Sequence, residues 1–152
     1  AGLEESAILI PNAELRKRFN TTMERIGIGG GNIFGVAALE AAYTYGGQWL
    51  DELLVYLQGN LDYLYENLKK VSSKVQFTRP EGTYLVWLDF RETGLLGEEL
   101  SRYIIDNARL GLNDGRSFGE EGNGFMRMNI ACPRVILKEG VDRLVGALDC
   151  LS

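Results

Sequence analysis

The spacing of apolar residues changes from helical to strand-like at one point of the chain, which limits the folds that it can form. In residues 48–71, apolar side chains recur every three or four positions, which predicts one long amphipathic helix. The residues of this stripe are Trp49, Leu53, Leu57, Leu61, Leu64, Leu68 and Val71. After Lys74 the pattern alternates, and residues 83–90 are predicted as a strand with Val86 and Leu88 on one face.

The segments after Lys74 follow the order strand, helix, strand, strand, helix. A helix is expected at residues 98–109, a short strand at 110–113, a strand around Arg127, and a last amphipathic helix that includes residues 137–148. This order predicts an α/β fold of the α+β type, a small sheet with helices on one face. We therefore expect two parts: connecting and interface helices in residues 1–74 and a small α/β domain in residues 75–152.

Two shorter helices are predicted before the long one, each started by an asparagine. Asn12 is the expected N-cap of the first helix and Asn32 that of the second. The second helix carries a face of small residues suited to a subunit or domain contact: Ala37, Ala38, Ala41 and Ala42. A short apolar strand is expected at residues 7–10.

A glycine-rich segment, residues 27–31, separates these two helices. It is not a phosphate-binding P-loop, because Gly30 and Gly35 have the right offset but Val36 and Ala37 replace the required Lys and Ser or Thr. It also does not complete a dinucleotide-binding fingerprint, since Asn32 takes the last glycine position and no strand precedes it. Two interpretations remain: a flexible break between helices, or backbone N–H groups at the second helix's start that face an anion.

Composition excludes several classes of function. Sixteen Lys and Arg stand against twenty-one Asp and Glu, a net charge of −5, and the basic residues are scattered, so neither nucleic acid nor a membrane surface is an expected partner. No apolar run approaches the roughly 20 residues of a membrane span. The chain has no histidine, which removes histidine-dependent nucleophilic catalysis and most zinc chemistry, and no metal site is predicted. Cys132 and Cys150 are expected to be packing thiols of a cytoplasmic protein.

One arginine stands inside a predicted strand. Alternation places Arg127 on one face with Phe125 and Asn129, while methionines lie on the other face. An unpaired buried charge is unfavourable, so this arginine needs either a carboxylate of the protein or an anionic ligand. The first alternative is a salt bridge, for example to Asp89 or Glu81. The second is a bidentate fork for a substrate carboxylate, with Asn129 helping to hold it.

Short motifs follow one another in a fixed order along nearly the whole chain. They are Ala-Gly-Leu at 1–3, Ile-Pro-Asn at 10–12, Asn-Ile-Phe-Gly at 32–35, Glu-Ala-Ala-Tyr at 40–43, Pro-Glu-Gly-Thr-Tyr at 80–84, Leu-Asn-Asp-Gly at 112–115, Phe-Gly at 118–119 and Arg-Met-Asn-Ile-Ala-Cys-Pro-Arg at 127–134. In this order they resemble the carboxyl-terminal part of class I and II pyridoxal-phosphate-dependent aminotransferases, which have fold type I, and specifically their cystathionine β-lyase-like branch.

The resemblance implies roles for two of these residues. Arg127 is expected to bind the α-carboxylate of an amino-acid substrate, and Asn32 to lie near the dimer interface and the partner subunit's cofactor pocket. The intact enzyme is expected to be a homodimer. It would use pyridoxal 5'-phosphate as an electron sink, either for transfer of an amino group or for carbon–sulfur β-elimination.

The resemblance also implies that essential parts lie outside this chain. In the family, the cofactor's lysine stands a few residues before a motif like that at residues 1–3, and the chain's five lysines are at other positions. We therefore expect a carboxyl-terminal fragment that contains no catalytic residue, binds no cofactor tightly and is inactive alone. The alternative is a self-standing, non-catalytic α/β module that binds an amino acid or a protein partner.

Overall fold

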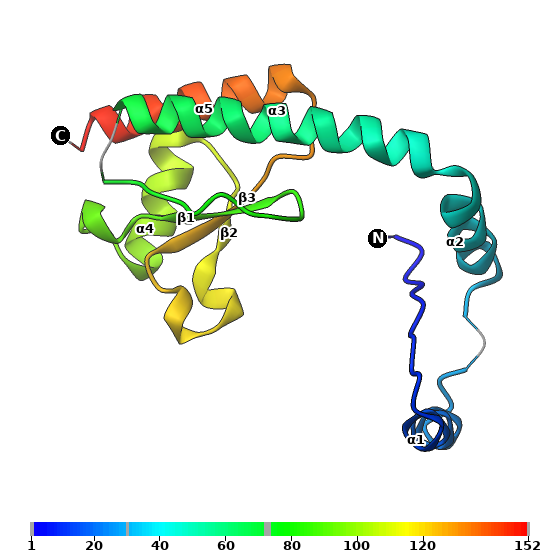
Figure 1. Cartoon of the computed structure of the whole chain (residues 1–152). Coiled ribbons are helices and arrows are strands. Elements are labelled where there is room, and N and C mark those ends of the chain that lie inside the picture. Colours follow the sequence, from blue (N-terminus) through cyan, green and yellow to red (C-terminus); the bar gives the residue numbers. More distant parts are fainter. Residues whose placement is uncertain (1, 30, 72–73, 152) are drawn as a thin grey trace. The chain divides into compact units, whose positions relative to one another are not determined.

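The computed structural model describes residues 2–29, 31–71 and 74–151, which form two compact units (Figure 1). The units are Ala1–Glu52 and Leu53–Ser152, so their boundary lies inside the long helix α3, Gly47–Val71. The domain boundary predicted from the sequence lies after residue 74, where the apolar spacing changes, and this division into domains stays a prediction. Ala1 of the Ala-Gly-Leu motif and Gly30 of the glycine-rich segment lie outside the described residues.

The first unit contains α1, α2 and the first residues of α3, and the N-caps predicted for α1 and α2 are both confirmed. Asn12 Oδ1 accepts a hydrogen bond from the backbone N–H of Leu15 at the start of α1, Ala13–Arg25, at 3.0 Å. Asn32 Oδ1 accepts one from the N–H of Phe34 at the start of α2, Ile33–Tyr45, at 2.9 Å. The strand expected at residues 7–10 is wrong: the segment has no strand partner, and Leu9 is 90% exposed.

The second unit contains a three-stranded antiparallel sheet in the order β1-β3-β2. The strands are β1, Leu85–Asp89, β2, Asn113–Asp114, and β3, Phe125–Asn129. Arg127 on the middle strand lies opposite Trp87 on one side and Asn113 on the other. The three predicted strands exist, but the first is shorter than expected, and the second, expected at residues 110–113, is found at Asn113–Asp114. At Thr83, for example, the backbone has a φ of +67°, a left-handed conformation that a strand does not contain.

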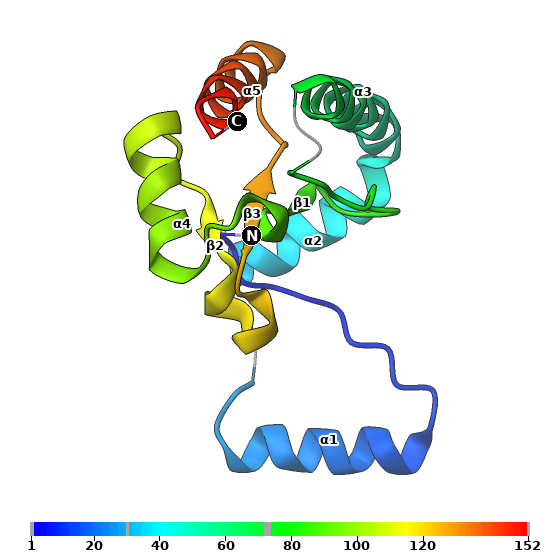
Figure 2. The ribbon, with the colours of Figure 1, turned by 90° about the vertical axis from the view of Figure 1, so that its left-hand side faces the viewer.

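Helices cover one face of this sheet, as predicted (Figure 2). They are the second part of α3, α4, Gly97–Tyr103, and α5, Arg134–Asp149. The expected single helix at residues 98–109 is instead α4 followed by a π-helical turn, Ile104–Ala108. Short 3₁₀ turns are Arg91–Thr93, Gly115–Phe118 and Glu120–Gly122. Within the described ranges, no helix is long and apolar enough to cross a membrane.

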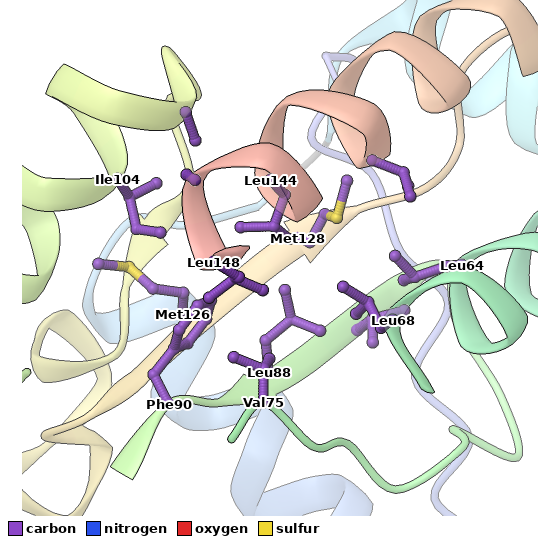
Figure 3. Close-up of a cluster of buried hydrophobic side chains, with 14 of the residues drawn as sticks. Leu64, Leu68, Val75, Leu88, Phe90, Ile104, Met126, Met128, Leu144 and Leu148 are labelled. Carbon is purple, nitrogen blue, oxygen red and sulfur yellow. The ribbon is translucent and has the colours of Figure 1, made fainter. Parts of the chain in front are cut away.

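The core lies between the sheet and these helices (Figure 3). Strand alternation puts Val86, Leu88, Met126 and Met128 on the covered face, and each is at most 6% exposed. Leucines from α3, α4 and α5 and one isoleucine from the π-helical turn complete the cluster: Leu64, Leu68, Leu100, Leu137, Leu144 and Ile104. Because alternate residues point away from this core, Arg127 is on the uncovered face of the sheet.

Candidate functional site

The candidate site is built around Arg127 on the uncovered face of the middle strand. Arg127 Nη2 donates a hydrogen bond to Oδ1 of Asn113 on β2, at 3.1 Å. This contact follows from the strand register, which pairs the two residues directly. The neutral amide can orient the guanidinium without neutralising its charge. Asn113 therefore holds Arg127 while leaving it able to bind an anion.

Aromatic rings line the face beside Arg127. Its guanidinium carbon lies 4.4 Å from the ring centroid of Phe118, a cation–π contact. Phe118 meets the ring of Trp87 edge-on with centroids 5.6 Å apart, and Trp87 stacks on Phe125 at the same distance. This row of rings supports the arginine with apolar contacts and a weak attraction for its charge, but supplies no counter-charge.

Arg127 forms no ion pair with any carboxylate in the described parts of the chain. Asp89, one of the two candidates from the sequence, is bound instead to Arg91, with hydrogen bonds of 3.0 and 2.7 Å. This bond holds the pKa of Asp89 below its ordinary value. The alternative of a salt bridge between Arg127 and Asp89 is thus wrong, because Arg91, two residues from Asp89, binds the carboxylate. No described ion pair joins Arg127 to Glu81 either.

One nitrogen of Arg127 is both buried and unsatisfied. Nε is shielded from solvent and has no hydrogen-bond partner among the described residues. A buried N–H without an acceptor is unfavourable by about 1–3 kcal/mol, and more when the group is charged. The guanidinium is therefore a donor group that its own chain does not fully satisfy, as expected of a residue that receives an anionic ligand.

The segment after β2 brings Phe118 against Arg127, and a compact loop positions it. Gly115 and Gly122 approach so closely that a Cβ on Gly115 would lie 2.7 Å from the carbonyl oxygen of Phe125 and closer still to that of Gly122. Asp114 Oδ2 accepts hydrogen bonds from Ser101 Oγ at 2.5 Å and from Arg116 Nη2 at 2.6 Å. The contact with the Arg116 guanidinium keeps the pKa of Asp114 well below its usual range, so this anchor is charged at neutral pH.

Asn129 lies on the same face as Arg127, as the alternation predicted, at the exposed end of β3. Its Oδ1 accepts a hydrogen bond from the backbone N–H of Ala131, at 2.8 Å. The amide that contacts Arg127 belongs to Asn113, which was not among the predicted site residues. Asn113 ends a predicted strand and lies in the Leu-Asn-Asp-Gly motif, but the sequence does not show that this strand pairs with the strand of Arg127. A supporting role for Asn129 stays a prediction.

Asn32 lies in the first unit, where its side chain caps α2. The carboxylate of Glu5 lies close to the start of this helix, since a Cβ added at Gly35 would be 3.1 Å from Glu5 Oε2. An acidic group at a helix N-terminus is favourable, so a carboxylate of the chain itself occupies the region where the sequence allowed an external anion. An interface role for Asn32 stays a prediction.

An aldehyde cofactor would need a lysine amine, and the chain has five lysines. Four of the five lysines are exposed, namely Lys17, Lys69, Lys70 and Lys138. The ammonium of the fifth, Lys74, donates to the backbone carbonyl of Leu151 at 2.8 Å. The strands β1, β2 and β3, which carry the face around Arg127, contain no lysine. The site thus fits the carboxylate end of a substrate, and does not supply a lysine for a cofactor.

Comparison with known proteins gives the family. The model of the family described as aminotransferase class I and II matches residues 7–144. The chain belongs to this family. Cystathionine beta-lyase PatB of Bacillus subtilis is 40% identical over 148 residues, covering 97% of this chain and 38% of that protein. The chain therefore spans well under half the length of this curated relative.

Solved structures agree with the fold. Cystalysin of Treponema denticola, which contains a pyridoxal 5'-phosphate cofactor, matches with a TM-score of 0.91 and 29% identity, covering 99% of this chain and 38% of cystalysin. The PLP-bound C-S lyase of Staphylococcus hominis matches with a TM-score of 0.83 and 34% identity, covering 97% and 37%. The chain has the fold of the corresponding part of these fold type I proteins.

Proposed function

We propose that the intact protein is a pyridoxal-phosphate-dependent enzyme acting on amino acids, in which Arg127 binds the α-carboxylate of the substrate. The observation that carries this proposal is the state of the Arg127 guanidinium. An amide and an aromatic ring hold it, no described carboxylate pairs with it, and its Nε is buried without an acceptor. Family membership and the pyridoxal phosphate in the similar structures support the same assignment.

The residues of this chain would bind and orient the substrate. Asn113 restrains one terminal nitrogen of Arg127 and Phe118 covers the guanidinium, so the remaining N–H groups are pre-oriented for a planar carboxylate. Gripping the carboxylate fixes the direction of the other bonds at the α-carbon. Asn129, at the end of the same strand face, would support this arrangement. Pyridoxal phosphate, held by residues outside this chain, would take up the electron pair left at the α-carbon.

Carbon–sulfur β-elimination is the reaction that we favour: the bond between the β-carbon and sulfur breaks, the sulfur leaves as a thiol, and hydrolysis of the remaining fragment gives pyruvate and ammonia. The support is the names of the relatives, a cystathionine beta-lyase and a C-S lyase. Transfer of the amino group to a keto acid is the alternative within the same family. Both reactions would use the same carboxylate contact, so Arg127 identifies the class of substrate and does not select between them.

The intact enzyme is proposed to be a homodimer, with Asn32 and α2 near the interface. The helix exposes Ile33, Phe34 and Tyr43 by 77%, 73% and 82%, and its small residues Ala37 and Ala41 are exposed as well. Exposed apolar surface of this extent on one helix is typical of an interaction surface. The oligomeric state of the full-length protein, measured by light scattering, tests this assignment.

The 152-residue chain alone is proposed to be inactive and to bind no cofactor tightly, because the three strands of the sheet around Arg127 contain no lysine. The purified chain should show neither turnover nor saturable uptake of pyridoxal phosphate. Catalysis by the chain alone would contradict this proposal. The alternative, a self-standing non-catalytic binding module, is tested by the assay of the full-length protein described next.

The decisive assay compares pyruvate release from cystathionine with keto-acid-dependent amino transfer by the full-length protein. Arg127→Ala should lower kcat/KM by about a hundredfold or more, since a substrate held in the wrong orientation loses much of the benefit of binding. The cofactor's visible absorbance should persist, because Arg127 holds the substrate and not the cofactor. An unchanged kcat/KM would refute the carboxylate role, and a full-length protein without either activity would favour the binding module.

A further inference from the structure

A buried asparagine on α3 binds the segment that follows the Arg127 strand. Asn60 is 0% exposed, and its Nδ2 donates to the backbone carbonyls of Ile130 at 2.8 Å and Cys132 at 3.1 Å. Its Oδ1 accepts a hydrogen bond from Nε of Arg134 at 2.6 Å. Both amide hydrogens and the oxygen of Asn60 are thus used, and every one of these partners lies in residues 130–134.

Three further residues on the same face of α3 contact or closely approach Arg134. The backbone N–H of Arg134 donates to the hydroxyl of Tyr56 at 2.6 Å. The guanidinium carbon lies 5.9 Å from the ring centroid of Tyr56 and 5.6 Å from that of Tyr63. Gly59 leaves the necessary room, since a Cβ there would lie 2.8 Å from Arg134 Nη2. We call Tyr56, Gly59, Asn60 and Tyr63 the α3 seat; their spacing places them on one side of a helix.

The α3 seat acts on the strand that carries Arg127. Ile130 directly follows β3, and its backbone N–H donates to the carbonyl of Tyr84 at 3.0 Å, which extends the pairing with the β1 side of the sheet. Ile130 is also 1% exposed. A shift of β3 by one residue would move Arg127 to the covered face and break both Asn60 contacts with the backbone.

We propose that Asn60 is a positioning residue for substrate binding: by holding residues 130–134 on α3, it fixes the register and height of β3 and so the direction of the Arg127 guanidinium. The inference rests on the proposed function, in which Arg127 binds the substrate carboxylate. Asn60 contacts neither the substrate nor Arg127, and acts through the backbone. Its effect is therefore specific to ligands that carry a carboxylate.

The test uses the full-length protein with its cofactor and two inhibitors of turnover, L-norvaline and butylamine, which differ only in the carboxylate. Asn60→Ala should raise the inhibition constant of norvaline about tenfold, because displacing a binding group by about 1 Å can reduce rates by up to roughly a hundredfold. The inhibition constant of butylamine should stay unchanged. Norvaline should lose no further affinity when Asn60→Ala is added to Arg127→Ala, because both changes remove the same contact.

Two further variants distinguish a positioning role of Asn60 from a general loss of stability. Asn67→Ala is the matched control, since Asn67 lies on the same helix and, among the described residues, its amide donates only to the carbonyl of Tyr63, at 2.7 Å. This variant should leave both inhibition constants unchanged. Tyr56→Phe is a milder variant of the α3 seat, which removes only the hydroxyl that accepts from Arg134. It should weaken norvaline binding selectively and by a smaller factor, and it tests the proposal if Asn60→Ala does not fold.

The outcomes separate the two proposals. If Arg127→Ala weakens norvaline but not butylamine, and the Asn60 and Tyr56 variants weaken neither, only the positioning role fails. If those two variants weaken both inhibitors equally, the role is purely structural and the inference also fails. If Arg127→Ala does not distinguish the inhibitors, the carboxylate role fails and the positioning role with it.

Discussion

Asn113 and Arg127 are joined across the sheet by a hydrogen bond of 3.1 Å, although fourteen residues separate them in the chain. Asn113 belongs to a strand of two residues at the edge of the sheet, and Arg127 to the middle strand. The short strand β2 thus places an uncharged acceptor, the amide oxygen of Asn113, beside the guanidinium of Arg127. The orientation of Arg127 depends on this pairing as well as on its own strand.

Replacing Asn113 by alanine in the full-length protein should therefore weaken substrate binding. Freed from its acceptor, the guanidinium can adopt other orientations, and KM should rise about tenfold with a smaller change in kcat. Asn107→Ala is the matched control, because Asn107 is exposed and, within the described parts of the chain, its amide donates only to the carbonyl of Tyr103, at 3.1 Å. Steady-state kinetics of both variants check this prediction, and equal effects would argue against an orienting role.

The aromatic support of Arg127 should be measurable as stability of the 152-residue chain. Phe118→Ala removes the contact with the guanidinium and the edge-on contact with Trp87. It should lower the free energy of unfolding in urea by about 1–2 kcal/mol. Phe34→Ala, at a ring that is 73% exposed on α2, should change it by less than about 0.5 kcal/mol. The prediction fails if the two variants cannot be distinguished.

The covered face of the sheet should tolerate truncation poorly. Leu88 is 0% exposed, and Leu88→Ala should reduce the free energy of unfolding by about 2–5 kcal/mol through lost contacts and a new cavity. Leu54→Ala is the control, since this leucine on α3 is 54% exposed and its truncation should have an effect below about 0.5 kcal/mol. Urea denaturation of the chain measures both. A small loss at Leu88 would mean that the core is not packed as described.

Asp114 should make stability depend on acid pH. Its pKa is lowered in the folded chain, mainly by the hydrogen bond to Arg116, whereas an unfolded aspartate titrates near about 3.9. The stabilising contribution is therefore fully present above about pH 4 and decreases as the pH falls toward the folded pKa. Asp114→Asn should destabilise the chain at pH 6 and have less effect at pH 3, as measured by urea unfolding.

A suitable control for this pH dependence is Asp142→Asn. In the described parts of the chain the Asp142 carboxylate makes no ion pair or hydrogen bond, so its replacement should leave the acid dependence unchanged. If the free energies of unfolding of the wild type and Asp114→Asn differed by the same amount at pH 6 and pH 3, the charge of Asp114 would not be what stabilises its loop.

Much of the second unit could be predicted because its apolar pattern matches its burial. The alternation around Val86 and Leu88 marked the covered face of the sheet, and the stripe from Leu57 to Leu68 marked the buried side of α3. Both asparagine caps were also recognised, since capping depends on local sequence. In these cases local preference and tertiary packing require the same residues.

The partners of the charged and polar residues could not be predicted, because the sequence does not show which of several candidates lies within bonding distance. Asp89 could pair with Arg91, two residues away, or with Arg127 on another strand, and the structure shows that it bonds to Arg91. Asn60 carried no signal in an otherwise ordinary amphipathic helix, although it is the polar residue held most completely in the core. The segment 7–10 was predicted wrongly for the opposite reason: its residues favour a strand, but no neighbouring strand pairs with it.

The arrangement of the sheet also bears on aggregation. Its middle strand is paired on both sides, and the edge formed by β2 offers only two residues, too few to template a further strand from another molecule. At the other edge, Gln76 exchanges backbone hydrogen bonds with Asp89, at 3.0 and 2.7 Å, and so covers the end of β1. The sheet thus carries its binding residue on the central strand, where both neighbouring positions are already paired, so that a strand from another molecule could join only at the edges.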